Sequence, residues 1–122
     1  MIYRSYIKIL IFIIIIFFGS CTEKSKYNSS KKILTSRSWK LNTFVNYHEN
    51  TLYDIGKTVY DFRDDDVLLR IINNDTLYSK WILFDDSEYL RIDQNTYKIT
   101  HLNKKTLSLR YGEFEMFFIG NK

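Results

Sequence analysis

Polar and apolar residues alternate along most of the chain from Trp39 onward, and this period of two is typical of half-buried β-strands. Short groups of Asn, Asp, Ser and Gly interrupt the alternation about every 8–12 residues, and these residue types favour turns. The pattern therefore predicts eight strands. They are expected at residues 39–46, 52–62, 67–72, 77–83, 89–92, 97–101, 107–111 and 114–118.

Eight short strands without a long helix predict an all-β fold, a small antiparallel meander that closes into a barrel of about eight strands. Closure removes the open sheet edges that otherwise promote aggregation. The alternation assigns one set of apolar side chains to the interior and another to the outer face. The interior set is Leu41, Val45, Leu69, Trp81, Leu83, Ile99 and Leu109, and the outer set is Phe44, Leu68, Ile72 and Phe117.

The N-terminal end differs from the rest because Ile9–Phe18 is an unbroken run of ten apolar residues. A helix needs about 20 residues to cross a bilayer, so this run is too short to span one. Arg4 and Lys8 precede the run, and small residues follow it. A cationic start, a short apolar segment and a small-residue exit predict a secretory signal peptide. An uncleaved signal anchor is the alternative.

The exit from this run, Phe18-Gly19-Ser20-Cys21, resembles the lipobox of bacterial lipoproteins. The resemblance implies cleavage before Cys21 and attachment of acyl chains to it, and two or three buried chains anchor a protein stably to a membrane. The expected organisation is a signal peptide over residues 1–20, a lipidated cysteine with a flexible tether over 21–32, and a barrel domain over 33–122. By analogy with enteric bacteria, Thr22 in place of aspartate after the cysteine indicates the outer membrane of a Gram-negative cell envelope.

Positive charge is concentrated before the predicted barrel. The chain has 18 Lys and Arg residues against 14 Asp and Glu, but from Trp39 onward 11 basic residues face 13 acidic ones. A nucleic-acid-binding domain needs a basic face, so no nucleic-acid partner is expected. The single cysteine excludes an internal disulfide. The basic tether is either a solvated linker or a segment lying near anionic head groups.

Several segments resemble, in order, the lipocalin-like domains of Bacteroidetes lipoproteins. The opening of those domains ends in Trp-Lys-Leu, found here as Trp39-Lys40-Leu41. The resemblance implies a small lipocalin-like barrel in the cell envelope, with Trp39 packing across the barrel base and no common enzyme activity. Stacking of Arg110 on Trp39 is a further expectation. The matching segments are residues 34–41, 60–62, 81–83, 89–92, 97–102 and 106–109.

Residues with catalytic or metal-binding chemistry do not form a recognisable motif. His48 and His101 are far apart, and His101 is expected to share a face with Tyr97. The acidic groups 64–66 and 85–88 lack the spacing of a calcium loop and are interpreted as solvated turns. Neither a nucleophile elbow nor a phosphate-binding glycine loop occurs. The sequence thus predicts no enzyme activity, no metal and no cofactor.

Two functions remain for a barrel of this kind. In the first, aromatic residues at the barrel mouth, Tyr97, Tyr111 and Phe114, bind a small apolar ligand. In the second, the barrel is a solid scaffold whose outer face docks another envelope protein or inhibits it, using the outer set of apolar residues. In both, the membrane is a partner through the acyl chains on Cys21. Binding of a small apolar ligand is the expected function, and docking or inhibition through the outer face is the alternative.

Overall fold

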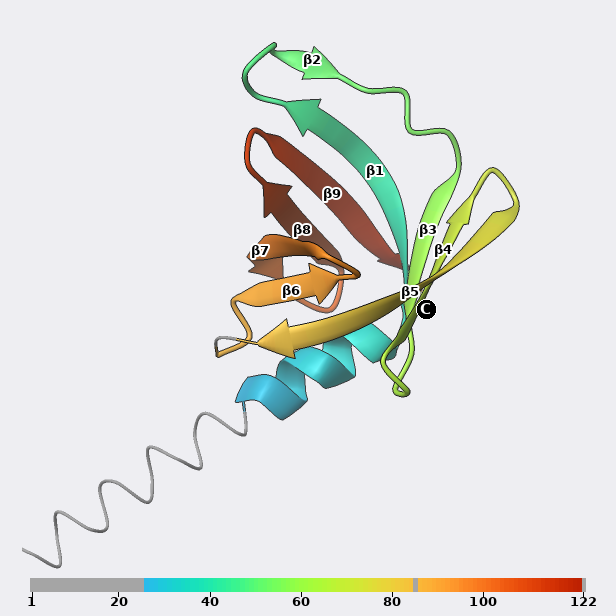
Figure 1. The fold of residues 1–122 in the computed structure, drawn as a ribbon, viewed down its shortest axis with the longest axis vertical. Coiled ribbons are helices and arrows are strands. Elements are labelled where there is room, and N and C mark those ends of the chain that lie inside the picture. The colour runs from blue at the N-terminus through green and yellow to red at the C-terminus, as the bar shows by residue number, and fades with distance from the viewer. Residues whose placement is uncertain (1–25, 85, 122) are drawn as a thin grey trace, which may run out of the picture.

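The strands form one closed antiparallel barrel, which confirms the predicted fold class. A computed structural model describes residues 26–84 and 86–121. Its sheet has the order β2-β1-β3-β4-β5-β6-β7-β8-β9, and an additional pairing of β1 with β9 closes the ring (Figure 1). Eight strands make the barrel. The ninth, β2, pairs only with the C-terminal end of β1. The strands are β1 Ser38–Asn46, β2 Thr51–Leu52, β3 Thr58–Phe62, β4 Val67–Ile72, β5 Asp75–Phe84, β6 Tyr89–Ile92, β7 Asn95–Leu102, β8 Thr106–Tyr111 and β9 Phe114–Asn121.

Turn chemistry sets the hairpin connections as the sequence predicts. Asn73 and Asn74 both have positive φ angles, 51° and 72°, between the paired residues Ile72 and Asp75. A two-residue hairpin with both angles positive matches the right-handed twist of its strands. Gly112 (φ 57°) opens the equally short β8–β9 turn.

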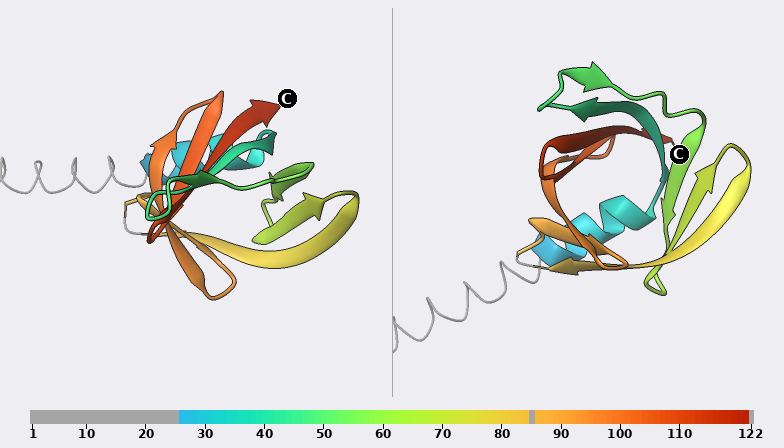
Figure 2. Two further views of the ribbon diagram at one scale, coloured as in Figure 1. Left: turned by 90° about the horizontal axis from the view of Figure 1, so that it is seen from above. Right: turned by 45° about the horizontal axis from the view of Figure 1, so that its top comes forward.

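A helix over residues 26–35 lies across one end of the barrel, which we call the base (Figure 2). The sequence predicts a flexible tether as far as Lys32, so the regular structure here begins earlier than expected. The side chain of Leu34 is completely buried, and the indole N–H of Trp39 donates a hydrogen bond to the Leu34 carbonyl at 3.1 Å. Short helices are marginal by themselves. Docking of the Leu34 turn on the barrel is therefore what stabilises this helix.

Two β-bulges change the inward-facing set from the one that strict alternation predicts. The pairing of β1 with β9 shifts between Leu41 and Thr43, so Phe44 faces inward beside Met116 and Val45 faces outward. A bulge moves every later side chain to the opposite face. The predicted faces of Phe44 and Val45 are therefore wrong.

A second shift, between Ile99 and His101 in β7, turns His101 outward beside Ser108. The prediction that His101 shares a face with Tyr97 is wrong for the same reason.

In strand β4, the side chains predicted to face inward face outward, and those predicted to face outward face inward. Leu68 pairs with Phe62, Arg70 with Tyr60, and Ile72 with Thr58. Because directly paired residues share a face, Leu68, Arg70 and Ile72 lie on the inner side, and Leu69 lies on the outer side. Apolar residues occupy both faces of this strand, so the period of two carried no information about which face is buried.

The core lies at the base, under the helix. Trp39 is fully buried there, and Phe62 packs edge-to-face on Trp81 with ring centroids 5.2 Å apart. Leu41, Trp81, Leu83 and Leu109 are buried in this core as the sequence predicts. Among the described residues, the other large side chains with almost no exposure are Phe118, Leu34, Leu68, Leu90 and Leu107.

The opposite end of the barrel, the mouth, is splayed. Strands β1 and β3 pair over three residues, Ser38–Lys40, and β2 covers the far end of β1 instead. Strand β5 pairs with β4 through Asp75–Lys80 and with β6 through Trp81–Phe84. Figure 1 shows β2 and the β4–β5 hairpin diverging at this end. Side chains near the mouth therefore have fewer neighbours than those at the base.

Candidate functional site

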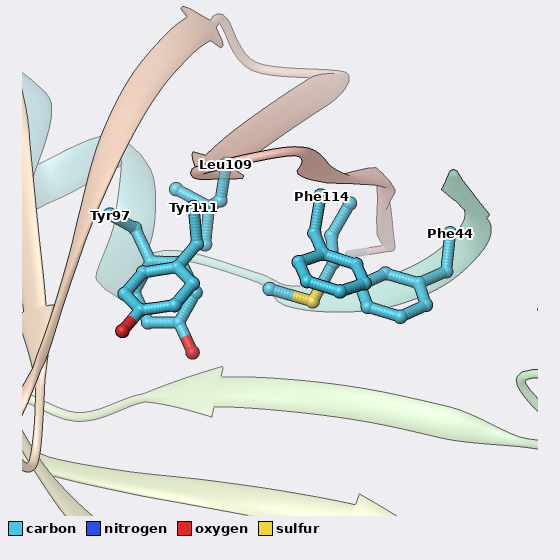
Figure 3. Close-up of a pocket in the computed structure, with 6 residues that line it drawn as sticks. Phe44, Tyr97, Leu109, Tyr111 and Phe114 are labelled. Carbon is cyan, nitrogen blue, oxygen red and sulfur yellow. The ribbon is translucent and has the colours of Figure 1, made fainter. Parts of the chain in front are cut away.

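An apolar pocket of about 150 Å³ lies on the inner side of the barrel at the mouth (Figure 3). Strands β1, β7, β8 and β9 supply its walls, and inward-facing positions on all four strands converge on it. Four of the six side chains are aromatic. The lining residues are Phe44, Tyr97, Leu109, Tyr111, Phe114 and Met116.

The aromatic rings stand in two pairs. Tyr97 and Tyr111 have ring centroids 5.4 Å apart, and Phe44 and Phe114 are stacked at 5.8 Å with an interplanar angle of 8°. Tyr53, which follows β2, packs on Phe44 at 4.9 Å from outside the lining set. In Figure 3 the tyrosine pair and the phenylalanine pair lie side by side. These separations are within the range of favourable aromatic contacts.

The structure brings together all three side chains that the sequence placed at the mouth. Tyr97, Tyr111 and Phe114 each line the pocket. Sequence reasoning missed Phe44, because the bulge between Leu41 and Thr43 is what turns it inward. The two consecutive polar residues before it, at positions 42 and 43, were the available sign of a break in alternation.

Trp39 lies at the base and not at the pocket. Its side chain is fully buried and its indole N–H is bonded to Leu34. The expected stacking of Arg110 on this tryptophan is wrong, because Arg110 faces outward and lies over the Tyr47 ring at 4.9 Å. A different cation, Lys31, lies over a tryptophan ring, with its Nζ 5.7 Å from the centroid of Trp81.

Polar side chains continue the inner surface beyond the pocket. Arg70 Nε donates to Ser79 Oγ at 3.0 Å, and its Nη2 lies 3.6 Å from Asp93 Oδ2. A backbone hydrogen bond from Lys80 lowers the pKa of Asp93. Burial raises the pKa of the Tyr60 hydroxyl, although the nearby charge of Arg70 opposes this rise. The inner surface thus combines an apolar pocket at the mouth with a cation, Arg70, and a buried phenol, Tyr60, deeper in the barrel.

The outer face lacks the predicted apolar patch, because Phe44, Leu68 and Ile72 all face inward. Of that set, Phe117 is on the outer side, where it lines a groove of about 400 Å³ along β8 and β9. The groove mixes apolar and polar side chains. Its lining residues are Asn42, His101, Thr106, Leu107, Ser108, Phe117, Phe118 and Ile119.

A buried carboxylate lies beside this groove. Glu115 accepts hydrogen bonds from the hydroxyls of Tyr47 and Thr100, each at 2.6 Å. The bond to Glu115 raises the pKa of Tyr47. The carboxylate therefore has two donors and is a satisfied structural group.

No group of three or more potential metal ligands occurs in residues 26–84 and 86–121. In the acidic turn after β3, Asp65 Oδ1 accepts from the Val67 N–H at 3.3 Å, and Asp66 lies 3.6 Å from Lys31. Asp85 lies outside the described residues. His101 Nε2 contacts the Asn103 amide at 2.9 Å.

The helix in the described part of the chain is not long or apolar enough to cross a bilayer. The predicted signal peptide and the predicted lipidation site Cys21 lie outside the described residues. Comparisons with protein-family models, with curated proteins and with solved structures found no match to this chain. The fold and the site together define a small closed β-barrel with an aromatic pocket at its open end.

Proposed function

We propose that the protein is a lipid-anchored lipoprotein of the cell envelope whose lipocalin-like barrel binds a small apolar ligand at its mouth. The observation that carries the binding proposal is the aromatic pocket, which the barrel builds from four strands without filling it. Ligand pockets are concave, mostly apolar and lined by aromatic side chains with a few polar groups nearby. The pocket and its neighbours Arg70 and Tyr60 have that composition.

The size of the pocket limits the ligand. Drug-sized molecules occupy pockets of about 300–1,000 Å³, whereas an engineered apolar cavity of about 150 Å³ in another protein holds benzene. The pocket at the mouth has about that smaller volume. The proposed ligand is therefore one aromatic ring or a short alkyl segment, with the rest of the molecule extending out of the pocket.

The alternative, docking through the outer face, has less support. It depended on an outer patch of four apolar residues, and three of the four face the interior. The outer groove at Phe117 has polar walls that include His101 and Ser108. Docking surfaces are expected to gather exposed apolar area in one patch. Ligand binding at the mouth is for this reason the better-supported function.

The proposed anchor would place the base of the barrel next to the membrane. Cys21 precedes residue 26, where the described helix begins, by five positions. Five residues span at most about 17 Å. Because the helix lies across the base, acyl chains on Cys21 would hold that end near the bilayer and leave the mouth directed away from it.

The anchor is tested by Cys21→Ala. The proposal expects wild-type protein to partition into the detergent phase with a mass increased by acyl chains, and the variant to lose both properties. A variant that keeps the wild-type mass and partitioning would refute lipidation at this cysteine. Ligand binding needs a separate test, because the barrel can bind a ligand with or without lipid.

Ligand binding is tested by titrating the protein with phenylacetamide, a neutral single-ring probe, and following protein NMR shifts. We expect saturable binding that weakens in Phe114→Ala. The matched control is Tyr78→Ala, because Tyr78 is 77% exposed, lies on the outer face of β5 and does not line the pocket. Equal affinity in both variants, or absence of saturable binding, would refute the mouth as the binding site.

A further inference from the structure

One cationic side chain, Arg70 of β4, lies on the inner face of the barrel. Arg70 pairs with Tyr60 on one side and with Leu77 on the other. Tyr60 is a buried core residue, so Arg70 shares the inner face. Six residues of β3 and β4 lie on this face, and Arg70 is the charged one among them. The six are Thr58, Tyr60, Phe62, Leu68, Arg70 and Ile72.

The guanidinium of Arg70 is held in position. Its Nε donates to Ser79 Oγ at 3.0 Å, its Nη2 lies 3.6 Å from Asp93 Oδ2, and its side chain is 27% exposed. A guanidinium carries five N–H donors in a fixed fork, so these two contacts leave donors for a further acceptor. The planar fork fits the two oxygens of a carboxylate.

The phenols of the pocket point toward the strands that carry this cation. In Figure 3 the hydroxyls of Tyr97 and Tyr111 point in the same direction, away from the strands that carry them and toward the green ribbons of β3 and β4. Burial raises the pKa of Tyr97, and the positive charge of Arg70 nearby opposes this rise. Burial raises the pKa of Tyr60 and of Tyr97, so both hydroxyls stay protonated at neutral pH and can donate hydrogen bonds.

We propose that the ligand is a small monocarboxylate, with its ring or short chain in the aromatic pocket and its carboxylate bound by Arg70 and the neighbouring phenols. This inference rests on the proposed function and names the chemical class of the ligand. A single negative charge fits better than a dianionic phosphate, because Asp93 already balances part of the charge of Arg70. The volume of the pocket restricts the apolar part to one ring or a few carbons.

The test compares two probes of the same shape that differ in charge, 4-fluorophenylacetate and 4-fluorophenylacetamide. Each is titrated against the full chain in phosphatidylcholine nanodiscs and followed by ¹⁹F NMR, with empty nanodiscs as the blank. A hydrogen-bonded charge pair contributes enough to change affinity about tenfold to a hundredfold. We expect the carboxylate to bind more tightly by that factor.

Substitution of Arg70 tests whether this residue causes the difference in affinity between the two probes. In Arg70→Met we expect the two probes to bind with equal affinity, while the affinity for the amide changes by less than about threefold, because the apolar pocket is intact. Arg70→Lys keeps the charge and guards against loss of folding, and we expect it to retain part of the preference. The control Arg63→Met removes the same charge from the turn at the base and should leave the preference unchanged.

The substitution Asp93→Asn tests the role of Arg70 in a second way, by removing the carboxylate that competes with the ligand for its charge. Asparagine keeps the oxygen that accepts the Lys80 N–H at 3.0 Å and tolerates the positive φ of this position (54°). Removal of the competing carboxylate should raise the affinity for 4-fluorophenylacetate several-fold and leave the amide unaffected.

Each outcome has one meaning. Equal binding of the two probes to the wild-type protein would overturn the carboxylate inference and leave the proposed pocket in place. A preference that persists in Arg70→Met would also overturn it, because the anion would then bind elsewhere. Failure of both probes to bind would refute the proposed function itself.

Discussion

The two ends of the barrel are built from similar aromatic residues, yet they are packed in different ways. At the base, Trp39, Phe62 and Phe118 are each at most 1% exposed, and the helix covers them. At the mouth, Tyr97 and Phe114 are half-buried and Tyr111 is 47% exposed. The base uses aromatic area to stabilise the fold, and the mouth leaves aromatic area uncovered. We therefore expect substitutions at the base to change stability most, and those at the mouth to change binding.

The largest effect is expected for Trp39→Ala. The change removes a fully buried indole and its hydrogen bond to Leu34, and such truncations cost about 3–5 kcal/mol. Phe114→Ala at the half-buried mouth should cost only about 1 kcal/mol of unfolding free energy. Urea denaturation followed by far-UV circular dichroism measures both values. Equal losses would show that the two ends are equally packed.

Leu34→Ala should have the next largest effect, about 2–4 kcal/mol, because it creates a cavity between the helix and the barrel. It should also increase hydrogen exchange in residues 26–35, since tertiary contacts stabilise this helix. The exposed helical residue Tyr27 offers the matched control, Tyr27→Ala. If exchange were equal in both variants, the helix would not depend on docking.

Substitution of two glycines, one near the base and one at the mouth, should have smaller effects on stability. A Cβ at Gly120, near the base, would lie 2.9 Å from Arg37 Cδ and 3.1 Å from the Lys104 carbonyl oxygen, so Gly120→Ala should cost about 1–3 kcal/mol by overpacking. A Cβ at Gly112, at the mouth, meets nothing within 4 Å, and Gly112→Ala should cost about 1 kcal/mol through its positive φ alone. Thermal unfolding of both variants would test this order, and a reversed order would contradict it.

The smallest expected effect is the contribution of Tyr60 to the pH dependence of stability. Burial raises the pKa of Tyr60 above 10.0, so the unfolded chain loses this proton first as pH increases. The contribution of Tyr60 to stability is therefore complete below about pH 10 and is lost as pH rises through the higher folded value. Urea midpoints at pH 8 and pH 10.5 should fall less in Tyr60→Phe than in the wild-type protein. An identical fall would show that this phenol is not the group responsible.

The alternation of polar and apolar residues predicted the barrel well. Residues 67–72 and 89–92 were predicted with the bounds of β4 and β6, and Asn73 predicted a turn. The side of the sheet on which each side chain lies was predicted less well. Bulges in β1 and β7 depend on pairing with a neighbouring strand, so the strand's own sequence carries little trace of them. In β4 both faces are apolar, and for that reason the alternation predicts Leu69 inside and Leu68 outside, the reverse of the observed arrangement.

The helix and the pocket residues likewise depend on tertiary contacts that the local sequence does not reveal. Residues 26–32 are mostly polar, and burial of Leu34 against the barrel accounts for a helix that propensity alone does not indicate. At the mouth, Tyr97, Tyr111 and Phe114 were predicted correctly, and each is the first or last residue of a predicted strand, next to a turn. Phe44 and Arg70 were missed, because their inward facing is decided by cross-strand register.

The most direct measurement of the central claim is the set of nuclear Overhauser contacts between bound phenylacetamide and the protein. A base that is closed and a mouth that is open predict contacts from the probe to the Met116 methyl group and to the rings of Phe44 and Phe114. The same account predicts no contacts to Leu34 or Trp39. Contacts at the base, or contacts spread over exposed side chains such as Tyr78, would contradict it.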